Sequence, residues 1–163
     1  MNSIYHEIPP IYDEHANILI LGTFPSVKSR AGNFFYNHPQ NRFWKVLAAV
    51  YRCNVPATII EKKEFLLQNH IAVWDVIQSC EIRGSSDSSI KNVVPNNLDI
   101  ILDVADIKEI YTNGQKAHKL YETYCLPATL RHDVPLPSTS PANAAFSLEK
   151  LIHVWKSEIG LYT

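Results

Sequence analysis

Side chains that can bind or polarise a ligand without a metal occur at three separate points of the sequence. Asn41 ends a proline-containing segment, Asn113 precedes a glycine, and the hydroxyl residues Ser138, Thr139 and Ser140 precede a proline. A primary amide offers both a hydrogen-bond donor and an acceptor, and a hydroxyl offers the same pair. Amides of this kind could orient a water molecule or stabilise a charge that develops during a reaction.

Alternating strands and helices would bring these three points together. The apolar run Asn17–Leu21 ends at Gly22 and is typical of a central parallel strand buried on both faces. The pattern further predicts strands at 71–77, 107–112 and near 136, helices at 41–51, 58–69, 97–104, 115–124 and 147–159, and loops at 23–40 and 79–92. We therefore predict one domain over 1–163, an α/β protein with a three-layer α/β/α sandwich around a central, mainly parallel four-stranded sheet. Ligands bind beyond the carboxyl ends of such strands, where the loop at 23–40, the Asn113-Gly114 turn and the segment 138–143 would meet.

The composition excludes several classes of protein. The chain has 163 residues, of which 46% are hydrophobic and 19% charged, as in an ordinary globular domain. No apolar run reaches the roughly 18 residues of a membrane span, and the first residues do not resemble a secretory signal. Three widely spaced cysteines indicate a reducing, cytoplasmic setting, and the seven histidines form no zinc-like spacing. We expect a monomer with no metal, no cofactor and no membrane contact.

Charge is distributed unevenly along the chain. The net charge is −1 and the pI is near 6.6, which argues weakly against a nucleic-acid partner. Residues 15–60 nevertheless contain no Asp or Glu, and neither do residues 134–148. The first of these segments holds five cations: Lys28, Arg30, Arg42, Lys45 and Arg52. A local basic face could attract phosphates despite the acidic total, although chance clustering explains the pattern equally well.

Four motifs resemble the uracil-DNA glycosylase superfamily. They are GTFPS from Gly22, FYNHPQNRFW from Phe35, WDVIQSCEIRGSSDSSIKN from Trp74 and LPSTSPAN from Leu136. Together they are most similar to the hypoxanthine-DNA glycosylase branch and extend over nearly the whole chain. The resemblance implies an enzyme of base excision repair that flips a deaminated base out of DNA and hydrolyses its N-glycosidic bond.

One position departs from the better-known branches of this superfamily. Where they carry Asp or Asn to position the attacking water, this chain has Phe24, whose ring cannot exchange a proton. The hypoxanthine branch shares this loss, and the resemblance implies that Asn41 supplies the catalytic amide. Asn41 would then orient water or donate a hydrogen bond to the departing base. The simpler interpretation is that Asn41 only caps the helix at 41–51, a role worth about 1 kcal/mol.

The resemblance also implies which residues contact the base and the DNA. It assigns base binding to Gly22, Thr23, Phe24, Tyr36 and Asn113, with the flipped base stacked on Tyr36. A tight turn explains Asn113-Gly114 equally well. DNA contacts are expected from Lys28 and Arg30 and from Ser138, Thr139 and Ser140. The bulky residue that usually wedges into the DNA is replaced by Ala142 and Asn143.

Asp87 is the one acid expected near this site, and we assign it no catalytic role because Asp in a serine-rich loop commonly caps a turn. The predicted partner is DNA that contains deaminated bases, hypoxanthine first among them. Two alternatives stay open: a glycosylase for uracil or mismatched pyrimidines, and a non-catalytic module that binds nucleotides or DNA.

Overall fold

The computed structural model describes residues 2–163, and a parallel sheet of four strands forms its centre. The strand order is β3 (Ile71–Asp75), β2 (Ile18–Gly22), β6 (Glu109–Asn113) and β7 (Val134–Leu136). All five residues of β2 and all five of β3 are buried, which explains their continuous apolar runs. The predicted sheet and its parallel pairing are confirmed.

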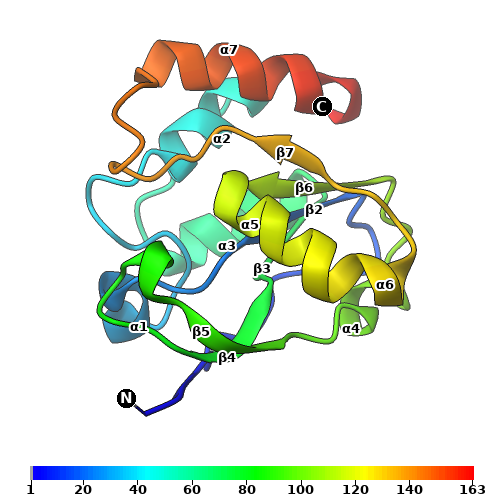
Figure 1. Cartoon of the computed structure of the whole chain (residues 1–163). Helices are drawn as coiled ribbons and strands as arrows, with labels where there is room; N and C mark the ends of the chain where they lie inside the picture. Colours follow the sequence, from blue (N-terminus) through cyan, green and yellow to red (C-terminus); the bar gives the residue numbers. More distant parts are fainter. Residues whose placement is uncertain (1) are drawn as a thin grey trace.

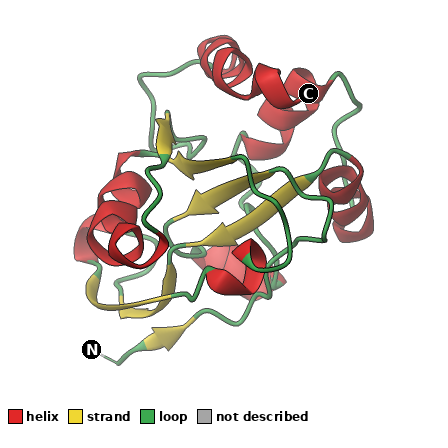
Figure 2. Ribbon diagram, turned by 90° about the vertical axis from the view of Figure 1, so that its right-hand side faces the viewer, coloured by secondary structure: helices red, strands yellow, loops and turns green. Residues whose placement is uncertain are grey.

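Helices surround this sheet, as Figures 1 and 2 show. The longer ones are α2 (Phe43–Tyr51), α3 (Ile59–Gln68) and α7 (Leu148–Ile159); the Thr58 side chain caps α3 and the Ser147 side chain caps α7. The shorter ones are α1 (Val27–Gly32), α4 (Asp99–Leu102), α5 (Gln115–Leu120), the π-helical turn η2 (Tyr121–Cys125), α6 (Leu126–Thr129) and the 3₁₀ turns η1 (Asp87–Ser89) and η3 (Gly160–Tyr162). Within residues 2–163, no helix combines the length and the apolar character needed to cross a membrane.

Packing between α2 and α7 closes the end of the molecule above the sheet. The Phe43 ring lies edge-on to the Trp155 ring, with centroids 6.1 Å apart. Trp155 Nε1 donates to the carbonyl of Pro137 at 2.9 Å, just after β7. The closing helix therefore fixes both the start of α2 and the segment that follows β7.

A second, antiparallel sheet was not predicted. Its order is β1 (Ile4–Tyr5), β4 (Ile77–Glu81) and β5 (Lys91–Pro95), so the predicted strand at 71–77 is two strands and the predicted loop at 79–92 is mostly strand and turn. The chain changes sheets at Val76, whose N–H still donates to the carbonyl of Gly22 at 2.8 Å. Val76 and Ile77 follow Asp75 directly, with no glycine or proline between the two strands, so this change was not predicted.

Two further boundaries differ from prediction near the site. The predicted loop at 23–40 contains the helix α1, which Ser26 caps by accepting from Ser29 N. Helix α2 starts at Phe43 with Arg42 at the N-cap position, so the N-cap predicted at Asn41 was wrong by one residue.

Candidate active site

A cavity of about 370 Å³ opens at the carboxyl edge of the parallel sheet. The segments after β2 and β7 and the last residues of β6 and β3 line it; the first three contributions were predicted and that of β3 was not. Nine of the sequence-predicted site residues line it: Gly22, Thr23, Phe24, Tyr36, Asn41, Asn113, Ser138, Thr139 and Ser140. Further lining residues that carry polar groups are Ser26, Ser29, His38, Asp75, Ser85 and Asp87.

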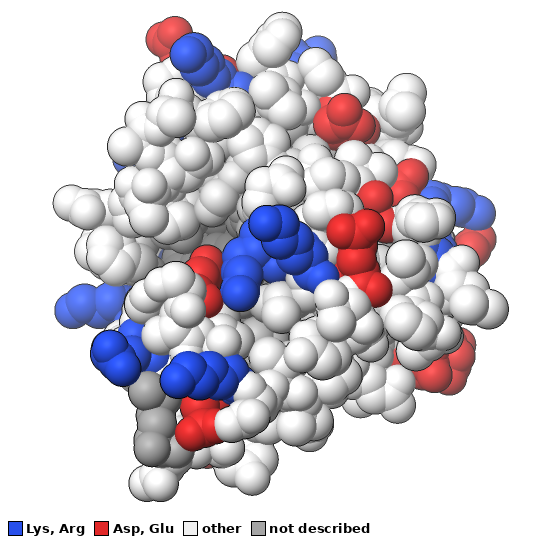
Figure 3. Space-filling model, viewed as in Figure 1, with Lys and Arg blue, Asp and Glu red and all other residues white. Residues whose placement is uncertain are grey.

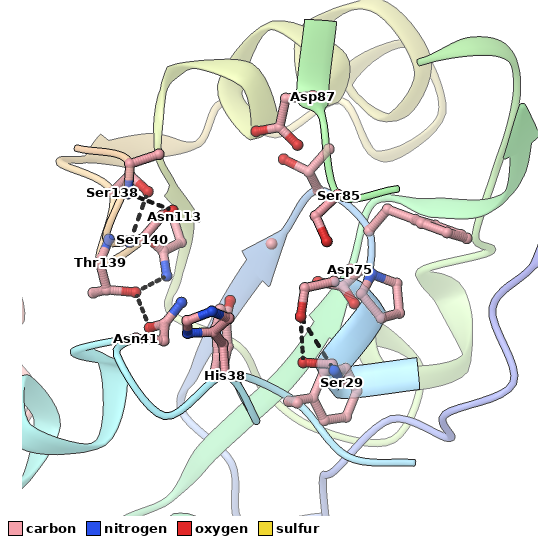
Figure 4. Close-up of a pocket in the computed structure, with 18 of the residues that line it drawn as sticks. Ser29, His38, Asn41, Asp75, Ser85, Asp87, Asn113, Ser138, Thr139 and Ser140 are labelled. Atoms are coloured by element: carbon pink, nitrogen blue, oxygen red, sulfur yellow. Dashed lines mark hydrogen bonds between the residues drawn. The ribbon is translucent and has the colours of Figure 1, made fainter. Parts of the chain in front are cut away.

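Three of these residues form a chain of hydrogen bonds on one wall of the cavity (Figure 4). The backbone N–H of Thr139 donates to Asn113 Oδ1 at 3.0 Å, and Asn113 Nδ2 donates to Thr139 Oγ1 at 3.0 Å. Thr139 Oγ1 then donates to Asn41 Oδ1 at 2.8 Å. A backbone N–H can only donate, so the first contact fixes the orientation of the Asn113 amide and, through it, the direction of the whole chain.

The Asn41 amide is fixed at its other side as well. The backbone N–H of Phe43 donates to Asn41 Oδ1 at 2.9 Å, at the first turn of α2. Asn41 therefore satisfies a helix N-terminal amide, as the capping interpretation expects, from the position before the N-cap. Two donors now occupy the lone pairs of Oδ1, and Nδ2 makes no hydrogen bond to the residues described. Asn41 thus presents an N–H donor to the cavity.

Arg42 holds the segment after β7 against α2. Its guanidinium donates to the carbonyls of Thr139, Ser140, Asn143 and Phe146. A half-buried guanidinium with four carbonyl partners has its donors committed to the fold. Of the five cations expected on a basic face, Arg42 is therefore a structural clamp.

The structure places Thr139 away from the surface on which a DNA contact was expected. Its side chain is fully buried, and its hydroxyl connects the two asparagines. Ser138 and Ser140 remain partly exposed, and their hydroxyl oxygens accept from the backbone N–H groups of Ser140 and Ala142 at 3.1 and 3.2 Å. Of the three predicted hydroxyl contacts, two are thus accessible to a phosphate.

Tyr36 lies between α2 and the sheet edge. Its ring stacks on the Phe43 ring, with centroids 3.8 Å apart, and its carbonyl accepts from Trp44 Nε1 at 3.2 Å. Within residues 2–163, no acceptor reaches its buried hydroxyl. Burial, and next the negative charge of Asp75, raise the pKa of this phenol well above its usual range. Tyr36 is therefore a neutral side chain with an unused donor.

Phe24 and Arg30 form a pair beside the cavity. The Phe24 ring lines the cavity and lies edge-on to the His6 ring at 6.0 Å. The Arg30 guanidinium sits 5.6 Å from the centre of the Phe24 ring, and Arg30 Nη2 donates to the carbonyl of Gly84 at 2.9 Å. Arg30 is half-buried and bound to the turn that precedes η1, whereas Lys28 is exposed, and neither lines the cavity.

The sequence analysis missed an acid at this site. Asp75 ends β3 directly opposite Gly22 of β2, lines the cavity and is buried. A Cβ on Gly22 would overlap Asp75 Oδ1 and would lie 2.8 Å from Tyr36 Oη, so only glycine lets both groups approach. The expectation that Asp87 is the only nearby acid was therefore wrong. A polar residue at the end of an apolar strand was the available signal, but the predicted strand continued past it.

Asp87 lies at the rim, on the opposite side of the cavity entrance from Asn41 (Figure 4). Partial desolvation raises the pKa of its carboxyl, with the charge of Lys116 opposing and that of Asp75 adding to the shift.

Figure 3 shows that Lys and Arg side chains lie on both sides of the hollow in this face, while most Asp and Glu side chains gather toward the right of the view. Across residues 2–163, no group of three His, Cys, Asp or Glu side chains is arranged to hold a metal ion.

Comparisons with known proteins agree with this geometry. Residues 9–157 match the family described as the Uracil DNA glycosylase superfamily. A Methanosarcina acetivorans protein named hypoxanthine DNA glycosylase is 35% identical over 141 residues, 85% of this chain and 88% of the relative. A Methanosarcina barkeri protein of the same name is 33% identical over 111 residues, 67% of this chain and 70% of the relative. The solution NMR structure of a candidate uracil DNA glycosylase from M. acetivorans superposes with a TM-score of 0.77 at 30% identity, covering 92% of this chain and 95% of that one. The chain belongs to the uracil DNA glycosylase superfamily.

Proposed function

We propose that this chain releases hypoxanthine from DNA by hydrolysing its N-glycosidic bond. Membership of the superfamily makes the chain a DNA glycosylase, and the two relatives named hypoxanthine DNA glycosylase support this base. The observation that carries the proposal is the Asn113–Thr139–Asn41 chain, which presents one fixed N–H to a cavity at the sheet edge.

The reaction needs a donor of this kind. Water adds to C1′ of the sugar, the C1′–N bond breaks, and its electron pair leaves with the base, which ends with the proton that water gives up. Negative charge therefore develops on the base as the bond breaks. With both lone pairs of Oδ1 occupied, Asn41 is suited to the second of its two expected roles, in which Nδ2 donates to the departing base. A fixed donor aimed at a developing charge is worth about 3–4 kcal/mol in other enzymes.

A flipped base has room and a partner in this cavity. Ligand pockets commonly enclose about 300–1,000 Å³, and the cavity volume of about 370 Å³ lies within this range. Phe43 covers one face of the Tyr36 ring, and we assign stacking of the base to the opposite face. Phe24 would supply an apolar wall beside the base. Stacking compensates the base for the neighbours it loses on flipping.

DNA would cross the mouth of the cavity between α1 and the segment after β7. Ser138 and Ser140 stand on one side with accessible hydroxyls, and exposed Lys28 stands in α1 on the other. Asn113 has one amide hydrogen left after its bond to Thr139, which limits it to a single contact with the base. A monomer acting on the chromosome in the cytoplasm is the simplest arrangement for this role.

A panel of oligonucleotides tests the proposal. Each carries one inosine, deoxyuridine, deoxyxanthosine or thymine mismatch, and base release is followed under single-turnover conditions. We expect the fastest release from inosine. Release of uracil alone would favour a uracil glycosylase, and tight binding without release of any base would favour a binding module.

A further inference from the structure

Asp75, at the end of β3, places a buried carboxylate in the cavity, and the proposed chemistry does not use this group. The Asp75 side chain is 5% exposed, and its Oδ2 lies 2.7 Å from His6 Nε2. Its second oxygen, Oδ1, accepts no hydrogen bond from any residue that the structure describes. Asp75 lies across the cavity from Asn41 (Figure 4), so the two side chains would meet different edges of a ligand held between them.

The second sheet holds this carboxylate in place. His6 follows β1, and its backbone N–H donates to the carbonyl of Gln78 in β4 at 2.6 Å. The imidazole ring is packed among the rings of Phe24, Phe35 and Trp74, with centroids 6.0, 5.9 and 6.5 Å away. These contacts hold the ring in place, with Nε2 against Asp75 Oδ2. His6 is therefore a positioning residue for the carboxylate.

We propose that Asp75 selects the base, with Oδ1 accepting the ring N–H that deamination creates. Adenine and cytosine present a ring nitrogen lone pair next to an amino group. Deamination turns this edge into a carbonyl next to a ring N–H, which is N1–H in hypoxanthine and N3–H in uracil. A carboxylate only accepts hydrogen bonds, so it matches the deaminated edge and opposes the lone pair of the unmodified one. Sites built on a buried hydrogen bond discriminate strongly, because the wrong ligand leaves the buried group unpaired.

This inference rests on the proposed glycosylase activity, although not on which deaminated base is preferred. Guanine carries the same N–H and differs from hypoxanthine by its 2-amino group. Asp75 therefore distinguishes hypoxanthine from adenine, and its substitution should leave any discrimination against guanine unchanged.

The test compares Asp75→Asn with the unsubstituted protein on two substrates. One oligonucleotide carries hypoxanthine, and the other carries unsubstituted purine, which has a lone pair at N1 and no carbonyl. The preference of each protein is its single-turnover rate on hypoxanthine divided by its rate on purine. Comparing this preference between the two proteins cancels the different intrinsic lability of the two glycosidic bonds. We expect Asp75→Asn to lower this preference at least tenfold through slower release of hypoxanthine, with release of purine changed less than threefold.

Equal slowing on both substrates would show that Asp75 acts on the water or on the fold, and would overturn the assignment. Should Asp75→Asn not fold, the unsubstituted protein decides alone: release of 1-methylhypoxanthine, which lacks the N–H, as fast as hypoxanthine would overturn it. His6→Gln, which keeps a donor beside Asp75, should retain more of the preference than His6→Ala. A protein that releases uracil instead is tested in the same way with uracil and 3-methyluracil. Release of no base at all would reject the proposed function, and with it this inference.

Discussion

Single residues at this site are defined by which of their hydrogen-bonding atoms are already used. The Asn41 side-chain oxygen accepts two hydrogen bonds while its N–H groups make none to the described residues. Among the same residues, one Asp75 oxygen contacts His6 and the other accepts no hydrogen bond, and the Tyr36 hydroxyl makes none. The sequence could predict that Asn41, Asn113 and Tyr36 meet, because motifs and strand ends place them. It could not predict which of their atoms face the cavity, because that depends on partners far away in the chain.

Removal of the Tyr36 hydroxyl tests whether this group is without a hydrogen-bond partner. A buried hydroxyl without a partner costs free energy, so Tyr36→Phe should leave the free energy of unfolding unchanged or raise it by up to about 1 kcal/mol. The ring stays in contact with Phe43, and base release should stay within about threefold of the unsubstituted rate. Thermal unfolding and single-turnover kinetics measure the two effects. Tyr36→Ala is the matched comparison, and equal activity in both variants would argue against stacking on this ring.

At the scale of elements, the site depends on a contact between α2 and the segment after β7. Apolar periodicity predicted α2, β2, β6 and the closing helix α7, because each buries a long apolar face. The antiparallel sheet escaped prediction because its strands are short and partly polar, as in β5, which has no fully buried residue. Asp75 was missed because the predicted strand at 71–77 continued past it. The change from one sheet to the other makes Asp75 the end of β3.

Thr139 connects these elements, and two substitutions separate its roles. Thr139→Val removes the hydroxyl, so Asn113 Nδ2 loses its acceptor and Asn41 Oδ1 loses one of its two donors, which should lower the free energy of unfolding by about 1–3 kcal/mol. Release of the base should fall roughly tenfold or more, because the Asn41 amide loses one of its two fixed donors. Thr139→Ser keeps the hydroxyl and should stay close to the unsubstituted protein in both measurements. Equal losses in the two variants would show that packing of the methyl group, not the hydrogen bond, is what matters.

For the molecule as a whole, the acid-free segment 15–60 has fewer cations free to contact a phosphate than its composition indicates. Arg42 is bound to four carbonyls and Arg30 to the carbonyl of Gly84, which leaves Lys28 as the exposed cation of α1. A count of charges in the sequence does not show which arginines are bound to carbonyl groups in the folded protein. Direct contacts with phosphates must therefore come from fewer of these cations than the sequence suggests.

Salt dependence of DNA binding measures this contribution. Lys28→Ala should weaken binding to all sequences about equally and reduce the slope of log affinity against log salt by about one. Arg30→Ala should change the slope less and lower the melting temperature more, because its guanidinium holds Gly84 and covers the Phe24 ring. Fluorescence anisotropy across a salt series, with thermal unfolding beside it, separates the two variants. An unchanged slope in Lys28→Ala would place the DNA path elsewhere on the surface.

In the proposed reaction Asn41 acts through the N–H that its hydrogen bonds leave free, and Asn41→Asp removes this N–H. An aspartate keeps an oxygen for Phe43 N and Thr139 Oγ1, so the melting temperature should stay near that of the unsubstituted protein. The N–H donor is lost, and the single-turnover rate of base release should fall by about 10²–10³. A folded Asn41→Asp protein that releases the base within severalfold of the unsubstituted rate would show that base release does not depend on this N–H.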